Sequence, residues 1–130
     1  MLSPSVDRLI RIALEEDIGP GDVTTASTIA PETMARAQLV AKEEFVLAGI
    51  DVARRVFEML DARIAFEGLI KDGQTVRRGE VLAWLKGDAA SLLQGERVAL
   101  NLLQRLSGVA TLTARFVRET VGTGAAGGGA

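Results

Sequence analysis

The stretch SLLQGERVALNLLQRLSGVATLT, from Ser91 to Thr113, decides the fold of this 130-residue chain, because it carries the cleanest helical pattern. At roughly 100° per residue, its apolar side chains fall within a sector about 140° wide. A stripe of this kind is typical of a helix that faces a hydrophobic core. The stripe comprises Val98, Ala99, Leu102, Leu103, Leu106, Val109 and Ala110.

The opposite side of the same helix carries an unusual polar row, made of Arg97, Asn101, Gln104 and Gly108. A solvent-exposed helix face is ordinarily charged, whereas this row offers one guanidinium, two amides and a bare backbone patch. The planar fork of an arginine matches the two oxygens of a carboxylate. The row therefore fits either a solvated helix face or a site for a planar anion.

Three stretches of the chain carry a family signature in a fixed order. They are EEDIGPGDVTT (Glu15 to Thr25), KEEFVLAGIDVARRVFEML (Lys42 to Leu60) and ERVALNLLQRLSGVATLT. Together they resemble the quinolinate phosphoribosyltransferases, also called carboxylating nicotinate-nucleotide pyrophosphorylases, over about Val6 to Val121. The resemblance implies an αβ-hammerhead-type amino-terminal domain, an α+β fold in which helices pack on one face of a sheet.

The resemblance also implies a role for the arginine of the Glu-Arg pair, which is Arg97 here. In the family this arginine reaches across a dimer interface and binds a carboxylate of quinolinate in the partner's active site. Asn101 and Gln104 could support it from the same helix face. We therefore expect a homodimer or higher homo-oligomer, with quinolinate bound at a composite site.

The activity implied for the whole enzyme is that of a pentosyltransferase of NAD biosynthesis. It converts quinolinate and 5-phosphoribosyl-1-diphosphate to nicotinate mononucleotide, CO₂ and diphosphate, with Mg²⁺. The family's α/β barrel, which holds the catalytic residues and the Mg²⁺, is absent from this sequence. We therefore expect no catalytic residue, cofactor or metal site in this chain, and no turnover by the chain alone.

Two other functions remain open at this point. The first is a related phosphoribosyltransferase with another acceptor, either nicotinate or that of the protein of molybdenum transport operons. The second is a non-catalytic dimerisation or interaction module that uses the apolar helix faces. The acceptor is chosen mainly by the absent barrel, so this sequence does not decide between the enzymes.

The composition excludes several classes of site. The chain has no His, Cys or Tyr, which removes the commonest general base, the thiolate nucleophile and the cysteine zinc site. A net charge of −2 gives no basic surface for nucleic acid. No apolar run reaches the roughly 18 residues that a membrane span needs, and no signal peptide is visible, so we expect a cytoplasmic protein.

An acidic cluster surrounds the first turn of the chain, formed by Glu15, Glu16, Asp17 and Asp22. Carboxylates are ligands that Mg²⁺ prefers, so a metal site is conceivable. Such a cluster is more often turn chemistry and solvated charge, and we expect no metal there.

The remaining pattern predicts an α+β order. A first helix starts at Ser3-Pro4-Ser5 and stops by Gly19–Gly21, strands lie within 35–48 and 62–86, and Asp51 can cap a second helix. Within 62–86, Val81, Ala83 and Leu85 alternate with Leu82 and Trp84, and turns are predicted at Lys71–Gln74 and Arg77–Glu80. Residues 1–121 then form the domain, and the Gly/Ala-rich residues 122–130 form a tail.

Small and polar residues mark the predicted third helix. Ser91 and Gln94 fit a capping box at its start. Gly95 and the Ser107-Gly108 pair lower its helix propensity, and each lets another backbone or a ligand come close. Close helix packing and ligand binding explain these glycines equally well. Arg105, at the edge of the polar face, fits a dimer interface or simple solvation.

Overall fold

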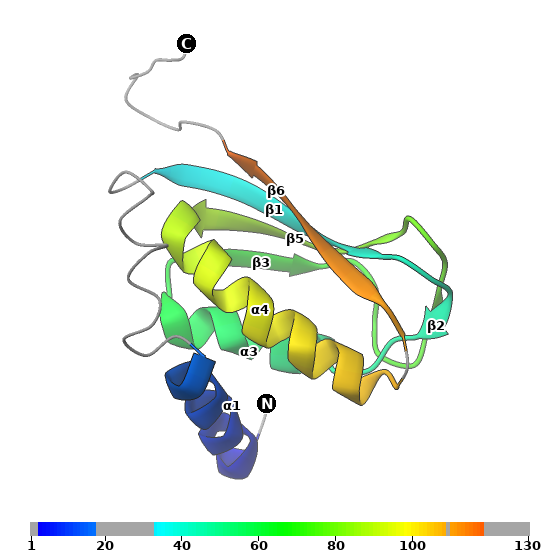
Figure 1. Ribbon diagram of the computed structural model, residues 1–130, viewed down its shortest axis with the longest axis horizontal. Helices are drawn as coiled ribbons and strands as arrows, with labels where there is room; N and C mark the ends of the chain where they lie inside the picture. Colours follow the sequence, from blue (N-terminus) through cyan, green and yellow to red (C-terminus); the bar gives the residue numbers. More distant parts are fainter. Residues whose placement is uncertain (1–2, 18–32, 109, 119–130) are drawn as a thin grey trace.

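The computed structural model describes residues 3–17, 33–108 and 110–118, which form an α+β arrangement of two layers (Figure 1). The helices are α1 (Pro4–Asp17), α3 (Ile50–Leu60) and α4 (Ala89–Leu106). The strands are β1 (Met34–Ala41), β2 (Phe45–Val46), β3 (Ala65–Gly68), β4 (Thr75–Val76), β5 (Val81–Asp88) and β6 (Leu112–Arg118).

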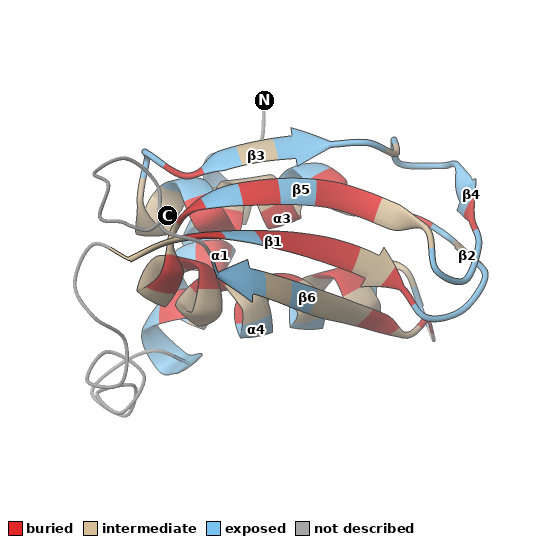
Figure 2. Ribbon diagram, turned by 90° about the horizontal axis from the view of Figure 1, so that it is seen from above, coloured by how far each residue is buried: buried red, intermediate tan, exposed pale blue. Residues whose placement is uncertain are grey.

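A four-stranded antiparallel sheet in the order β3-β5-β1-β6 forms one layer, and β2 pairs with β4 in a separate two-stranded ribbon. In the central strand, Ala37 lies opposite Leu85 of β5 and Phe116 of β6. The helices lie on one face of the four-stranded sheet, and its other face is turned toward the viewer in Figure 2. The predicted α+β fold, with helices on one face of a sheet, is confirmed.

The core lies between the sheet and helices α3 and α4. Residues with two-residue spacing on β1, such as Ala37 and Leu39, point into it. Strand β5 has a β-bulge at Leu82, the extra residue opposite the step from Leu39 to Val40 of β1, and Leu82 and Ala83 both point into the interior with 0% exposure. The predicted alternation of Leu82 with Ala83 is therefore wrong, because the bulge interrupts the two-residue period.

Helix α4 differs at both ends from the predicted span of 91–113. Asp88 is its N-cap, and the Asp88 carboxylate accepts hydrogen bonds from the backbone N–H (3.1 Å) and the hydroxyl (3.2 Å) of Ser91. Ser91 thus lies inside the first turn and is not the cap. The helix stops at Leu106, and Gly108 has φ +83°, the left-handed conformation that often terminates helices.

The residues after Gly108 form a strand that the sequence pattern did not predict. Ala110 is buried outside the helix, and Val109 lies outside the described residues. From Leu112 the chain runs antiparallel to β1 as β6. Leu106, predicted in the apolar stripe, is half exposed at the helix end.

Helix α3 is capped by a residue distant in sequence. Gly49 at the N-cap has φ +98° and no capping side chain, and the Asp72 carboxylate accepts the Ile50 N–H at 2.9 Å instead. Asp51, the predicted cap, lies in the first turn and pairs with Arg54 at 3.1 Å. A cap from the turn after β3 ties that turn to the helix.

The strand that follows α3 is shorter than its pattern suggests. It was predicted from Ala62, but β3 begins at Ala65. Both predicted turns are confirmed by hydrogen bonds between backbone groups. The Gln74 N–H donates to the Lys71 carbonyl at 3.2 Å, and the Glu80 N–H donates to the Arg77 carbonyl at 3.0 Å.

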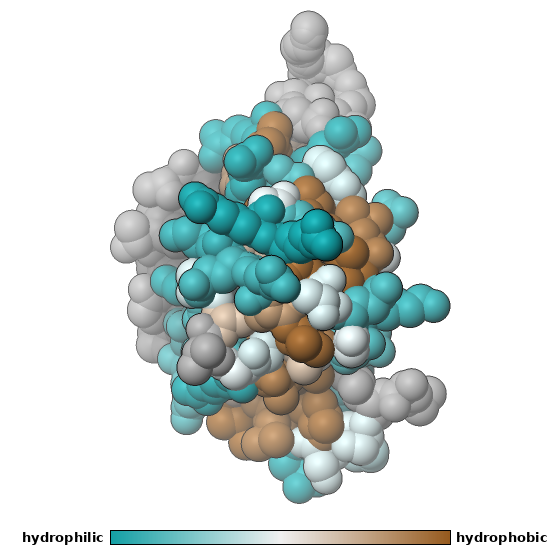
Figure 3. Space-filling view, turned by 90° about the vertical axis from the view of Figure 1, so that its right-hand side faces the viewer, coloured by the Kyte–Doolittle hydropathy of each residue, from teal (hydrophilic) through white to brown (hydrophobic). Residues whose placement is uncertain are grey.

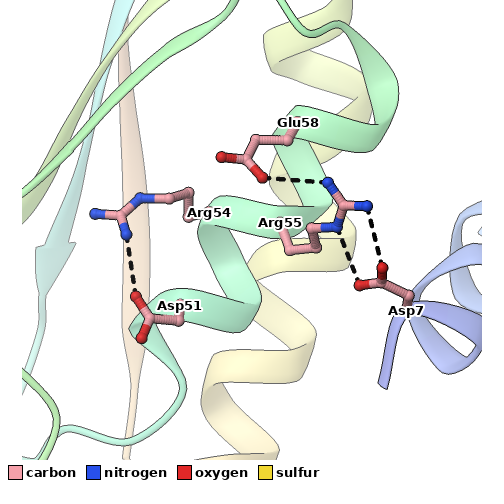
Figure 4. A network of polar contacts seen from close by, with 5 residues as sticks. All are labelled: Asp7, Asp51, Arg54, Arg55 and Glu58. Atoms are coloured by element: carbon pink, nitrogen blue, oxygen red, sulfur yellow. Dashed lines mark hydrogen bonds and ion pairs between the residues drawn. The ribbon is translucent and has the colours of Figure 1, made fainter. Parts of the chain in front are cut away.

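Helix α1 packs against α3 and α4 on the side away from the sheet, and it begins after Ser3 as predicted (Figure 1). Ile10 and Leu14 are buried in this contact. Arg55 of α3 donates two hydrogen bonds of 3.0 Å to the carboxylate of Asp7, which holds the first half of α1 against α3 (Figure 4). This hydrogen bonding lowers the pKa of Asp7 below its usual range.

Apolar side chains also remain on the outside of the domain. Leu9 and Ile12 of α1 are exposed, as are Leu106 of α4, Trp84 of β5 and Val117 of β6. The space-filling view of one end of the molecule shows apolar surface gathered at the level where α1 lies in Figure 1 (Figure 3). Contiguous apolar surface of this kind marks candidate contact regions.

Candidate functional site

A hollow of about 460 Å³ lies between the C-terminal end of α1 and the outer face of α4. It joins two elements that are far apart in the sequence and brings cationic, amide and acidic side chains together. Its lining residues are Ala13, Glu16 and Asp17 from α1 and Arg97, Val98, Asn101, Leu102 and Arg105 from α4.

Arg97 is the central cation of this hollow. Its Nε donates a hydrogen bond of 3.1 Å to Oδ2 of Asp17, and the two side chains are 56% and 35% exposed. The guanidinium is therefore paired with an acid of its own fold, yet it lies at the surface where a ligand can reach it.

The polar row predicted on α4 is divided by the structure. Arg97 and Asn101 both line the hollow, whereas Gln104 is half-buried and is not part of its lining. Gly108 lies beyond the end of the helix and cannot continue the row. Arg97 and Asn101 stay together because residues four apart lie on neighbouring turns of one face.

Two residues of the hollow were not predicted for it. Arg105 was placed at the edge of the polar face, but it lines the hollow and forms no ion pair with any residue that the structure describes. Its spacing of eight from Arg97 is about 2.2 helical turns, which places it about 80° round the helix, so the spacing alone is a weak signal. Asp17 was interpreted as part of an acidic turn, and its contact with Arg97 spans 80 positions. Local pattern carries no signal for such a contact.

The acidic cluster does not form a metal site among the residues described. Asp22 lies outside them, and nowhere in residues 3–17, 33–108 and 110–118 do three His, Cys, Asp or Glu side chains group closely enough to hold a metal ion. None of the described helices is long and apolar enough to cross a membrane.

Gly95 of α4 has a packing role. A Cβ placed on Gly95 would lie 2.6 Å from Cε1 of Phe57 and 2.9 Å from Cδ1 of Leu60, both on α3. Of the two explanations left open for this glycine, close helix packing is the one that the contacts support. The glycine allows α3 and α4 to approach closely, which fixes the position of α4 and of Arg97 on it.

Glu96 precedes Arg97 and is half-buried, and desolvation raises the pKa of its carboxyl while the Arg97 charge opposes the rise. The pKa of Glu96 is higher in the folded state than in the unfolded state, so protonated Glu96 favours folding. This contribution to stability is fully present below the pKa of the unfolded state, and it is lost as the pH rises through the pKa of the folded state. We expect Glu96→Gln to raise the free energy of unfolding at pH 7 by less than about 1 kcal/mol, because the group is only half-buried.

Urea denaturation of both proteins at pH 4 and pH 7 measures this effect. The advantage of Glu96→Gln should be larger at pH 7, because wild-type Glu96 is ionised there against its desolvation. Glu44→Gln, an exposed site, controls for the loss of one surface charge. A stability advantage that grows as the pH falls would contradict the assignment.

Comparison with known proteins places this architecture in a family. Residues 22–107 match the family model described as "Quinolinate phosphoribosyl transferase, N-terminal domain". A relative from Bacillus subtilis, "Probable nicotinate-nucleotide pyrophosphorylase [carboxylating]", is 48% identical over 103 residues, which cover 79% of this chain and 35% of the relative. A relative from Nicotiana tabacum, "Quinolinate phosphoribosyltransferase [decarboxylating] 1b", is 42% identical over 106 residues, or 81% of this chain and 30% of the relative.

Solved structures give the same result. The crystal structure of NadC from Streptococcus pyogenes matches with a TM-score of 0.78 and 40% identity, over 83% of this chain and 39% of that protein. The nicotinate-nucleotide pyrophosphorylase from Francisella tularensis matches with a TM-score of 0.73 and 34% identity, over 80% of this chain and 37% of that protein. The chain thus spans roughly a third of the length of these relatives.

The antiparallel sheet with helices on one face, the family model and the matching solved structures identify an amino-terminal domain of the phosphoribosyltransferase type. The chain belongs to the quinolinate phosphoribosyltransferase family, and it corresponds to the amino-terminal domain of that family.

Proposed function

We propose that this domain serves an enzyme that joins quinolinate to the ribose phosphate of 5-phosphoribosyl-1-diphosphate. The products are nicotinate mononucleotide, CO₂ and diphosphate, and the reaction belongs to NAD biosynthesis. The names of the matched relatives favour quinolinate over nicotinate or another acceptor. Catalytic groups and Mg²⁺ belong to the barrel domain, so the isolated chain is inactive. The proposed setting is cytoplasmic.

The observation that carries this proposal is the half-exposed Arg97 guanidinium in a hollow on the outer face of α4. Quinolinate has two carboxylates, and a planar guanidinium can hold one of them through paired N–H donors. Asn101 lines the same hollow and has an amide that can donate a further hydrogen bond. Gln104 is the weaker candidate for support, because it does not line the hollow.

The site is proposed to be completed by a second subunit. The described part of the chain has no group that could act as a general acid or base beside Arg97 other than carboxylates. In a homodimer or higher homo-oligomer, Arg97 of one subunit would bind quinolinate held in the barrel of its partner. The exposed apolar side chains Leu9 and Ile12 of α1 are consistent with a subunit contact.

The test uses the full-length protein that carries this chain. Arg97→Ala is expected to raise KM for quinolinate about 10- to 100-fold, because a hydrogen bond to a charged group is lost. Arg78→Ala removes the same charge from an exposed position on the turn between β4 and β5, and it should change KM less than about twofold. An unchanged KM in Arg97→Ala, or an equal rise in Arg78→Ala, would refute the carboxylate site.

Mixed subunits test whether Arg97 acts in the partner's site. Arg97→Ala subunits are combined with subunits that keep Arg97 but have an inactive barrel. Random pairing restores one working site in each mixed dimer, or about a quarter of the wild-type activity. Recovery of no activity would mean that Arg97 acts within its own subunit.

A further inference from the structure

Asp17 lies at a position that local helix energetics does not favour. It is the last residue of α1 and follows Glu15 and Glu16, with no basic residue in the last turn. The C-terminal end of a helix carries partial negative charge, so acidic side chains there are unfavourable by about 0.3–1 kcal/mol each. Residues that break a local rule often have a role in the function of the protein.

The helix that carries Asp17 is fixed against the rest of the domain. Ile10 and Leu14 bury its inner face, and the Asp7 carboxylate accepts two hydrogen bonds of 3.0 Å from Arg55 of α3. Asp17 is therefore presented to α4 from a rigid element. Groups that orient a binding residue act best from such elements.

The atom that contacts Asp17 determines what the ion pair can do. Asp17 accepts its 3.1 Å hydrogen bond from Nε of Arg97. A carboxylate at Nε lies beside one edge of the planar guanidinium, and the five N–H donors of the group point along more than one edge. The contact at Nε therefore fixes the plane in which the guanidinium lies.

We propose that Asp17 is a positioning residue, which holds the Arg97 guanidinium in the orientation that receives a carboxylate of the substrate. This inference rests on the proposed function, because it assigns Asp17 to the same site. Fixing the fork before binding reduces the rotamer entropy that Arg97 loses when the ligand arrives. The carboxylate of Asp17 touches Arg97 and takes no part in the reaction itself.

Kinetics of the full-length protein with quinolinate as the varied substrate test this proposal. Asp17→Asn is expected to raise KM for quinolinate about three- to tenfold and to change kcat less than about twofold, because it removes one charged hydrogen bond to Arg97. Asp17→Glu, which retains the carboxylate, should recover part of the loss. Asp7→Asn removes another ion-paired carboxylate of α1, which lies outside the hollow and helps to hold the helix. It measures how far loosening of α1 alone raises KM, and its rise should be smaller than that of Asp17→Asn.

Three results would overturn the proposal. An unchanged KM in Asp17→Asn would remove the positioning role, and a lowered KM would mean that Asp17 competes with the substrate for Arg97. An equal rise in Asp7→Asn would mean that loosening of α1 alone explains the effect. The double variant Asp17→Asn/Arg97→Ala should match Arg97→Ala, because Asp17 acts only through Arg97.

Failure of this inference can be distinguished from failure of the proposed function. If Arg97→Ala raises KM and Asp17→Asn does not, the carboxylate site stands and the positioning role falls. If Arg97→Ala leaves KM unchanged, the carboxylate site itself falls, whatever Asp17→Asn does.

Discussion

Phe57→Ala is expected to lower the free energy of unfolding by about 3–5 kcal/mol, the range for removing a buried aromatic ring. Phe57 is 2% exposed, lies beneath α4 at Gly95, and has its ring centroid 6.1 Å from that of Phe66. The loss is a large part of the roughly 5–15 kcal/mol that stabilises a typical domain. Urea denaturation followed by circular dichroism measures it.

A substitution on the facing helix tests whether the contact is as close as described. Gly95→Ala should destabilise the domain by about 1–3 kcal/mol through overpacking, although alanine favours helix by about 1 kcal/mol over glycine. In a Phe57→Leu background, which frees space beside Gly95, the cost of Gly95→Ala should fall. A stabilising Gly95→Ala in the wild-type background would contradict the packing of α3 on α4.

Gly49→Ala is expected to lower the free energy of unfolding by about 2–4 kcal/mol, because backbone strain and steric overlap act together. Gly49 has φ +98°, and a Cβ there would lie 2.5 Å from Cδ1 of Leu106. The overlap follows from the docking of the α3 N-terminus against the end of α4, whereas the strain belongs to the backbone of Gly49 itself. Equilibrium unfolding of the variant gives the total cost.

Two other glycines separate the two effects. Gly73 and Gly79 have φ +90° and φ +87°, and a Cβ on either would meet no atom within 4 Å. Gly73→Ala and Gly79→Ala should therefore show the strain alone, about 1–2 kcal/mol. In a Leu106→Ala background the overlapping side chain is absent, so adding Gly49→Ala should lower the free energy of unfolding by the strain alone. Equal losses at Gly49 and Gly73 would contradict the contact with Leu106.

The site was predicted in part from sequence. The spacing of four between Arg97 and Asn101 sufficed to place them on one helix face, and both line the hollow. The same reasoning extended the row to Gln104 and Gly108, because periodicity alone does not show where a helix ends or which side chains a neighbouring element covers. Arg105 and Asp17 line the same hollow because α1 packs against α4, and the sequence pattern does not show this contact.

The fold, like the site, was predicted in part from the sequence. The apolar periods identified the helices around Leu14, Val56 and Leu103 and the strands around Leu39 and Leu85, since burial of one face imposes those periods. Strand β6 was missed because its preceding residues continue the apolar pattern of α4, and its hydrogen-bond partners lie in β1. Pairing between distant strands has no local sequence period.

What the sequence by itself determined is the α+β class, the amphipathic helices and the family stretches, because these depend on neighbouring residues and on one-sided burial. The structure decided the caps at Asp88 and Asp72 in place of Ser91 and Asp51, the bulge of β5 opposite Leu39, and the Asp17–Arg97 ion pair. Most of these features join groups that are distant in the chain. The caps depend on the residue at which each helix begins, and the bulge depends on how β5 pairs with β1. Apart from Asp88 and Ser91, which are three residues apart, the partners in these features become neighbours only when helices and strands pack together.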